Sequence, residues 1–162
     1  MKRVSWKYLA GLVDGEGCID AMMGKYNTPH HKRFYVRPRL RICMADMAVD
    51  LLKMLHANFG GSLQARATHL VNPKWQSSTS WELVGYRDTC PLLRNIVNHL
   101  FLKREQARLC LWMEQHIKGQ QIGQPAIDLI REELALMKRD VHRLSETAQT
   151  RVWDAIVGTA PS

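Results

Sequence analysis

One carboxylate, Glu16, stands out as a candidate for binding a cation. It lies between Gly15 and Gly17 at the end of an apolar stretch, Tyr8 to Val13, that has the spacing of a helix. A helix that is apolar nearly all round is usually buried nearly all round. The negative end of the helix dipole adds to the charge of the carboxylate, so a cation is attracted to this position. The sequence therefore predicts a cation site at the end of a buried helix.

Three arginines form a second group with an evident chemistry. Arg37, Arg39 and Arg41 alternate with apolar residues between Phe34 and Met44, so in a strand all three project from one face. A solvated face would normally mix Thr, Glu, Lys and Ser, and no acid within this stretch balances the arginines. We interpret the face as a nucleic-acid surface. Pro38 forbids full pairing of the strand at the centre of a sheet.

The composition also predicts an acidic partner. The 162 residues carry a net charge of +8, and 46% of them are hydrophobic, enough for the core of one domain. This charge favours nucleic acid first and an anionic membrane surface second. No apolar run approaches the roughly 20 residues that span a bilayer, and the first residues lack the pattern of a signal or transit peptide. We expect no membrane partner and a cytoplasmic location.

The cysteines and histidines show no metal-binding pattern. Cys18, Cys43, Cys90 and Cys110 are scattered without a C-x-x-C pair, and His30-His31 lack the spacing of metal ligands. We expect reduced thiols, as is usual in the cytosol.

Periodicity predicts the order helix, strand, strand, helix, strand, strand, followed by further helices. The first helix has Ser5 as its N-cap and runs to about Gly15, and Asp46 caps the second; the other expected elements are strands at 18–27, 34–44, 62–68 and 78–86 and the second helix at 45–59, ended by Gly60-Gly61. The last two strands are expected to form a hairpin around the polar loop 69–77.

The rest of the chain is predicted to be helical. Asp88 or Thr89 is expected to cap a segment with Pro91 in its first turn, and a second helix is expected at 103–118. A stripe of apolar residues from Ile127 to Leu144 predicts a long helix that packs on the back of the sheet, and the tail from 145 can form one more short helix.

The nonapeptide Leu9 to Gly17, L-A-G-L-V-D-G-E-G, resembles the signature of the LAGLIDADG homing endonucleases. In that family the motif helices of two half-molecules pack together, and the acid at the eighth position binds the catalytic metal. The resemblance implies that Glu16 and Gly15 form the metal site and that Leu9, Gly11, Leu12 and Gly15 form a dimer interface. One copy of the motif implies a homodimer. Asp14 is assigned to hydrogen bonding at the helix end.

A second segment, Leu100 to Ala107, is similar to the family segment that carries a functional lysine. The match falls on Lys103, which would stabilise developing charge as a fixed cation. One position departs from the family pattern. Where the family often has a Gln that orders water near the metal, this chain has Met44, whose thioether has no hydrogen-bond donor to hold that water. Asp46, Gln64 or ordered water alone are the open alternatives.

The resemblance implies an α+β fold: an α-β-β-α-β-β-α core with a four-stranded antiparallel saddle sheet that binds DNA, backed by helices, plus extra C-terminal helices. One endonuclease domain would cover residues 1–162, with its core at about 5–118 and its C-terminal helices at about 124–157. The DNA contacts expected on the sheet are Arg37, Arg39, Arg41, Arg66, Gln64, Ser80, Glu82, Lys25 and Tyr26.

The implied activity is Mg²⁺-dependent hydrolysis of both strands of a long, pseudo-palindromic DNA site, with Mn²⁺ or Ca²⁺ as substitute ions. An intron-encoded gene, including one of organellar origin, would fit this class. Two alternatives stay open. A non-cleaving relative would act as an RNA splicing maturase or a DNA-binding regulator, although Glu16 and Lys103 together favour the enzyme. A helical protein-interaction module would use the stripe from Ile127 to Leu144, with basic charge serving only solubility.

Overall fold

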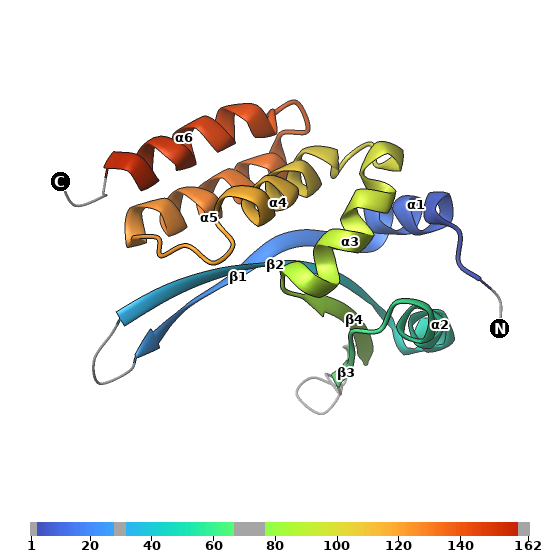
Figure 1. Ribbon diagram of the computed structural model, residues 1–162. Coiled ribbons are helices and arrows are strands. Elements are labelled where there is room, and N and C mark those ends of the chain that lie inside the picture. The colour runs from blue at the N-terminus through green and yellow to red at the C-terminus, as the bar shows by residue number, and fades with distance from the viewer. Residues whose placement is uncertain (1–2, 28–31, 67–76, 159–162) are drawn as a thin grey trace.

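The computed structural model describes residues 3–27, 32–66 and 77–158. Within these ranges the predicted α+β class is confirmed, with four strands and six α-helices (Figure 1). The elements are α1 (Trp6–Glu16), β1 (Gly17–Asn27), β2 (Lys32–Ala45), the 3-10 turn η1 (Asp46–Ala48), α2 (Val49–Phe59), β3 (Ser62–Arg66), β4 (Ser78–Val84), α3 (Tyr86–Ile96), the 3-10 turn η3 (Val97–His99), α4 (Arg104–His116), α5 (Gln124–Arg139) and α6 (Ser145–Gly158). The predicted loop 69–77, apart from Ser77, and the His30-His31 pair lie outside the described residues.

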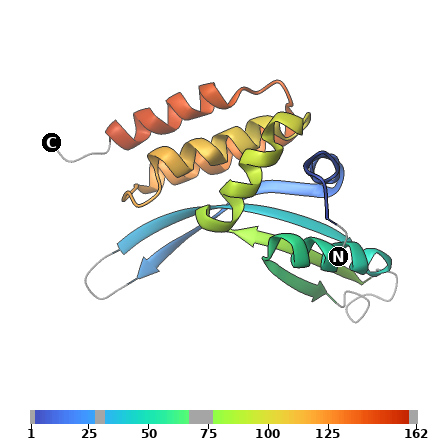
Figure 2. The ribbon, with the colours of Figure 1, turned by 45° about the vertical axis from the view of Figure 1, so that its right-hand side comes forward.

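The strands form one antiparallel sheet in the order β1-β2-β4-β3. The sheet is curved, and α3, α4, α5 and α6 lie on one side of it, so that its other side is open (Figures 1 and 2). The predicted hairpin of β3 and β4 is confirmed. In the part of the chain that the structure describes, no helix has the length and apolar character needed to cross a bilayer.

Pro38 lies where only one side of β2 is paired by a strand. It faces Ala21 of β1, whereas the ladder with β4 begins one residue later, at Arg39. The Pro38 carbonyl instead accepts hydrogen bonds from the Gly85 amide at 2.8 Å and the Thr89 hydroxyl at 3.3 Å. Because proline has no N–H, it is tolerated at this position without an unsatisfied donor.

The core lies between the covered face of the sheet and the helices. The alternate residues Ile19, Leu40, Ile42 and Trp81 are fully buried there. The Trp81 indole N–H donates to the Gly60 carbonyl at 2.8 Å, so the ring satisfies its one donor inside the core. The predicted helix stop at Gly60-Gly61 is confirmed.

Three expectations about helix starts are wrong. Asp46 caps no helix, because its carboxylate accepts the Thr79 hydroxyl at 3.1 Å and α2 begins only at Val49. Asp88 and Thr89 lie inside α3, which begins at Tyr86. The positive φ of 97° at Gly85 turns the chain directly from β4 into the helix. Pro91 consequently lies beyond the first turn.

The C-terminal helices are arranged differently from the single long helix that was expected. Helix α5 ends at Arg139, and Val141 and Leu144 of the predicted stripe are exposed. Helix α5 contacts β1 and β2 as expected, and it also packs against α4 and α6. The fully buried Glu133 carboxylate accepts from Arg143 at 2.8 and 2.9 Å and from Arg151, which joins α5 to α6 and to the segment between them.

Candidate nucleic-acid interface and catalytic site

Helix α1 delivers the Glu16 carboxylate to the junction of helix and sheet. The helix begins at the Ser5 cap, whose hydroxyl accepts the Tyr8 amide at 3.2 Å, as predicted. It ends at Glu16, and Gly17 starts β1 at once; a Cβ on Gly17 would lie 2.7 Å from the Val13 carbonyl oxygen. Glycine therefore permits the abrupt change from helix to strand. The Glu16 side chain is exposed and makes no hydrogen bond or ion pair with the described residues.

Asp14 joins the end of α1 to the segment before α4. Its carboxylate accepts the backbone N–H of Phe101 at 2.6 Å and of Lys103 at 3.0 Å. In return, the Lys103 ammonium donates to the Asp14 carbonyl oxygen. The hydrogen bonding predicted for Asp14 is confirmed. These contacts place Lys103 against Asp14, which lies two residues before Glu16 on α1. Lys103 and Asp14 are 89 positions apart in the sequence.

The expectation that α1 is buried nearly all round is wrong for the single chain. Leu9, Ala10 and Val13 face the core, whereas Tyr8, Gly11 and Gly15 are exposed. A Cβ at Gly11 or at Gly15 would meet nothing within 4 Å. The packing of this chain therefore does not require either glycine.

The predicted dimer interface needs one correction. Leu9 is fully buried inside the chain, because it lies one turn from Val13 on the core side of α1. Leu12 is partly exposed beside the glycines and stays in the predicted set. Near the end of α1, Phe101 is 81% exposed and is bonded through its backbone to Asp14.

The three arginines share the open face of the sheet, as predicted, but their environment differs from the expectation. Asp20 on β1 lies opposite Arg39 and binds it through two bonds of 2.8 and 3.0 Å. An acid on the neighbouring strand therefore balances one arginine of the row, although residues 34–44 themselves contain no acid. Alternation in β1 places Asp20 on the same face as Arg39, but the sequence does not show the strand register that makes them neighbours.

The Asp20 carboxylate is also paired with a cation on a helix. Lys138 on α5 places its ammonium 3.6 Å from Asp20. Burial raises the pKa of Asp20, but the hydrogen bonds and charge of Arg39, together with the charge of Lys138, outweigh burial and leave the pKa below its usual value. Asp20 is thus an ionised residue that neutralises part of the cationic face.

Arg37 lies in an aromatic cluster near the end of the β1–β2 hairpin. Its guanidinium lies 4.9 Å from the ring centre of Tyr35 and 5.9 Å from that of Tyr26, and it donates to the Tyr26 hydroxyl. Lys25 lies on the opposite face of the hairpin, with its ammonium 5.3 Å from the Phe34 ring centre. It therefore does not share the arginine face on which it was expected.

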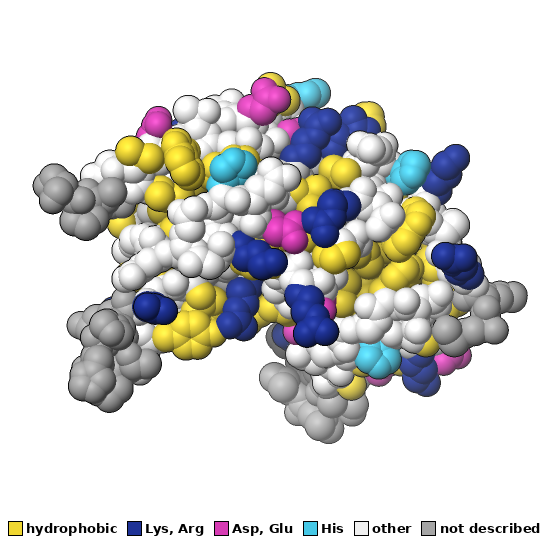
Figure 3. Space-filling model, in the orientation of Figure 1, with side chains coloured by type: hydrophobic (Ala, Val, Ile, Leu, Met, Phe, Trp, Pro, Cys, Tyr) yellow, Lys and Arg dark blue, Asp and Glu magenta, His cyan; other side chains and the backbone are white. Residues whose placement is uncertain are grey.

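The β3–β4 hairpin adds polar groups to the open face. The Gln64 amide donates to the Glu82 carboxylate at 3.0 Å, and Arg66 is exposed on the same face. Ser80 is only 4% exposed, and its hydroxyl donates to the Gln64 carbonyl at 3.4 Å. The structure leaves Ser80 little surface for the expected DNA contact. Lys and Arg side chains are scattered over the side of the molecule that Figure 3 shows, which has the orientation of Figure 1.

The two residues named from the sequence as water-ordering alternatives, Asp46 and Gln64, are engaged elsewhere. Met44 lies against the core, Asp46 is bonded to Thr79, and Gln64 is bonded to Glu82. Sequence reasoning missed a different residue, Gln106 on α4, which is buried near Lys103 and lines a cavity with it. It falls inside the segment matched to the family, but no periodicity marks it as more than a core position.

The described residues contain no group of three or more His, Cys, Asp and Glu side chains that could enclose a metal ion. From its own residues near the end of α1, one chain offers the Glu16 carboxylate and the exposed backbone at Gly15. Both are oxygen donors, the type that Mg²⁺ and Ca²⁺ prefer.

Comparison with known proteins identifies the fold. No protein-family model matches the sequence, and no curated protein matches it. Among solved structures, the chain is similar to the homing endonuclease I-CvuI, at 21% sequence identity over 93% of each chain and with a TM-score of 0.66. The chain therefore has the fold of the LAGLIDADG homing endonucleases.

The two I-CvuI structures are both complexes with DNA. In one, I-CvuI binds an I-CreI target in the presence of 2 mM Mg, and the DNA is not cleaved. In the other, I-CvuI binds its own target in the presence of 2 mM Ca.

Proposed function

We propose that this chain is a site-specific DNA endonuclease that works as a homodimer. The observation that carries the proposal is the joint placement of Glu16 and Lys103 at the end of α1. An unpaired carboxylate and a lysine held by the same helix end lie beside an open, arginine-bearing sheet. A metal ligand and a fixed cation are two groups that can stabilise the charge that develops during phosphodiester hydrolysis.

The exposed glycines of α1 support the homodimer. Glycine inside a helix costs about 1 kcal/mol relative to alanine. Neither Gly11 nor Gly15 is needed by packing within the chain. A second copy of α1 packed against this face would use both, because glycine lets two helix backbones approach closely.

The oxygen donors at the end of α1 fit Mg²⁺ as part of a ligand set. One carboxylate and one backbone carbonyl are too few, so the partner chain and the phosphates of DNA would supply the remaining oxygens. When bound, Mg²⁺ would activate water and stabilise charge on the phosphate and the leaving oxygen. Glu16 is free to act as a ligand because no described residue competes for it.

Lys103 acts from a fixed position. The Asp14 carbonyl accepts from its ammonium, and the Asp14 carboxylate holds its backbone N–H. A cation that is already oriented stabilises developing negative charge without reorganising during the reaction. The side chain therefore needs no rearrangement when DNA binds.

The open sheet face would read the DNA. A homodimer presents two such faces related by a two-fold axis, which matches a pseudo-palindromic site with half-sites about 10 bp apart. Arg41 and Arg66 are the best placed of the arginines. Arg39 is held by the Asp20 carboxylate and Arg37 by the Tyr26 hydroxyl and two aromatic rings, whereas Arg41 and Arg66 have no such partner among the described residues. The logarithm of the binding constant should fall linearly with the logarithm of salt concentration, with a slope of about −0.9 for each phosphate contacted.

Selection of cleaved sequences from a randomised duplex library in Mg²⁺ tests the proposal. We expect a pseudo-palindromic site cut on both strands. Glu16→Gln should abolish cutting and leave DNA binding intact. Glu146→Gln, the same substitution at an exposed position on α6, is the matched control and should cut normally. DNA binding without cutting in any divalent metal would refute the nuclease and leave a DNA-binding regulator; selective binding of intron RNA would favour a maturase.

A further inference from the structure

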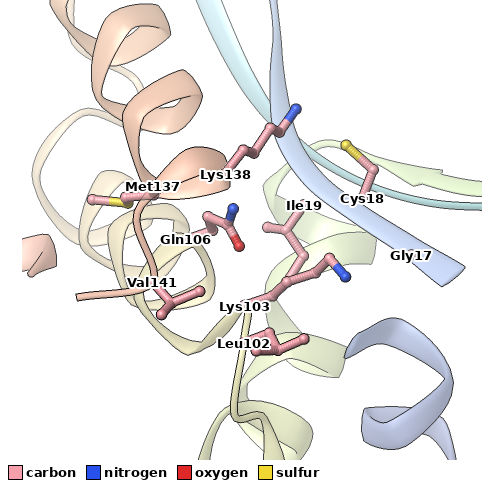
Figure 4. A pocket seen from close by; sticks show the side chains of 9 residues that line it. All are labelled: Gly17, Cys18, Ile19, Leu102, Lys103, Gln106, Met137, Lys138 and Val141. Carbon is pink, nitrogen blue, oxygen red and sulfur yellow. The ribbon is translucent and has the colours of Figure 1, made fainter. Parts of the chain in front are cut away.

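A cavity of about 250 Å³ opens beside Lys103. Its walls come from the start of β1, the beginning of α4 and the end of α5, three segments that are far apart in the sequence (Figure 4). Gly17, the residue after Glu16, lies on its rim, so the cavity adjoins the proposed catalytic site.

The cavity has an unsatisfied polar group in its wall. Gln106 is 2% exposed, and its side-chain oxygen Oε1 is buried without a hydrogen-bond partner in the protein. In Figure 4 that oxygen points toward the side chains of Ile19 and Lys103. A buried carbonyl oxygen without a donor is costly, and such groups in folded proteins are usually satisfied by ordered water.

We propose that this cavity is a hydration site in which ordered water molecules link Gln106 Oε1 to the Lys103 ammonium, one of them donating to Gln106 Oε1 and another accepting from Lys103. The volume is large enough for several water molecules. Lys103 has three N–H groups, and the Asp14 carbonyl accepts only one of them. Lys138 and Cys18 also line the cavity and add further polar partners. An apolar ligand is disfavoured, because it would leave the Gln106 oxygen unsatisfied.

This inference rests on the proposed function for its catalytic consequence. Water held at Lys103 is available at the phosphate bound beside Glu16. In the hydrolysis, the water oxygen forms a bond to phosphorus while the bond from phosphorus to the 3′ oxygen breaks. One hydrogen of the water ends on the 3′ oxygen, and the other leaves as a proton to solvent. Gln106 is a positioning residue in this reaction, and it takes the water-ordering work that the Met44 thioether cannot do.

Two substitutions separate hydration from structure. Gln106→Met keeps the approximate shape and removes the polar oxygen, whereas Gln106→Glu keeps an acceptor oxygen. Gln115→Met, at an exposed position on the same helix, is the matched control. We expect Gln106→Met to lower kcat for cleavage at least tenfold, with KM and the Kd for DNA unchanged and an unfolding temperature that is equal or higher. Gln106→Glu should retain most of kcat, and Gln115→Met should retain all of it.

A high-resolution crystal structure would show ordered water in the cavity directly, and this result does not depend on cleavage activity. Water within hydrogen-bond distance of Gln106 Oε1, lost in Gln106→Met, supports the site even if the wild-type chain cuts no DNA; in that event the proposed function and the catalytic consequence both fail. A dry cavity in the wild type overturns the hydration site. Wild-type kcat in Gln106→Met overturns the positioning role, as does a loss of kcat accompanied by a lower unfolding temperature and weaker DNA binding.

Discussion

Asp14→Asn tests how the catalytic lysine is held. The Asp14 carboxylate accepts two backbone N–H groups, at 2.6 and 3.0 Å. An asparagine offers one oxygen to these donors and turns an NH₂ group toward the other, so one amide of the 101–103 segment loses its acceptor. Hydrogen bonds to charged groups contribute about 1.5–3 kcal/mol each. Because Asp14 is partly exposed, we expect a loss near the lower end, about 2 kcal/mol.

Such a loss is measurable by urea or thermal unfolding followed by circular dichroism. For a chain of this length, about 2 kcal/mol corresponds to a fall of roughly 4–8 °C in Tm. Asp50→Asn is the matched control, because the Asp50 carboxylate is 93% exposed and contacts only Lys53 at 3.4 Å. Its loss should stay below about 0.5 kcal/mol.

Cleavage assays well below Tm give the functional half of the prediction. The carbonyl at position 14 still accepts from the Lys103 ammonium, but the 101–103 segment loses one of its two backbone contacts and should hold Lys103 less firmly. We therefore expect kcat to fall while metal binding to the protein–DNA complex remains. An unchanged Tm in Asp14→Asn would refute the assigned hydrogen bonding. If Asp14→Asn abolished metal binding while Glu16→Gln did not, the roles of the two acids would have to be exchanged.

Three further predictions follow from particular contacts. Burial raises the pKa of Glu133, but hydrogen bonds from its two arginine partners outweigh burial and leave the pKa below its usual value. The ionised Glu133 therefore stabilises the folded state above the unfolded pKa of about 4.3, and this stabilisation is lost as pH falls through the lower folded pKa. Glu133→Gln should cost about 1–3 kcal/mol at pH 7, because the arginines it leaves, Arg143 and Arg151, are 28% and 40% exposed and can be hydrated. It should also flatten the acid limb of a plot of unfolding free energy against pH. Gly11→Ala with Gly15→Ala should leave the fold of the single chain intact, since the added Cβ atoms meet nothing within 4 Å, yet light scattering should find monomer instead of dimer. Arg39→Ala should lower stability, because Asp20 is left without its bidentate partner, whereas Arg41→Ala should leave stability unchanged and weaken DNA binding in fluorescence anisotropy.

The sequence by itself determined the order and class of the elements. Three features depend only on residues within a few positions of one another, and each was confirmed: the Ser5 cap, the Gly60-Gly61 stop and the alternation of the arginines with apolar residues. The motif at the end of α1 also identified the fold, because its residues are contiguous.

Only the tertiary structure decided which distant residues meet. Asp20 neutralises Arg39 because of the register of β1 against β2, and Asp14 holds Lys103 across 89 positions because α1 packs beside the start of α4. The orientation of α1 decided that Leu9 is buried while Gly11 and Gly15 are exposed. These outcomes depend on how the elements pack against one another. The sequence on either side of a residue does not show which distant residue it will contact. The carboxylate at Glu16 was thus predictable, and the lysine and cavity beside it were positioned by the fold.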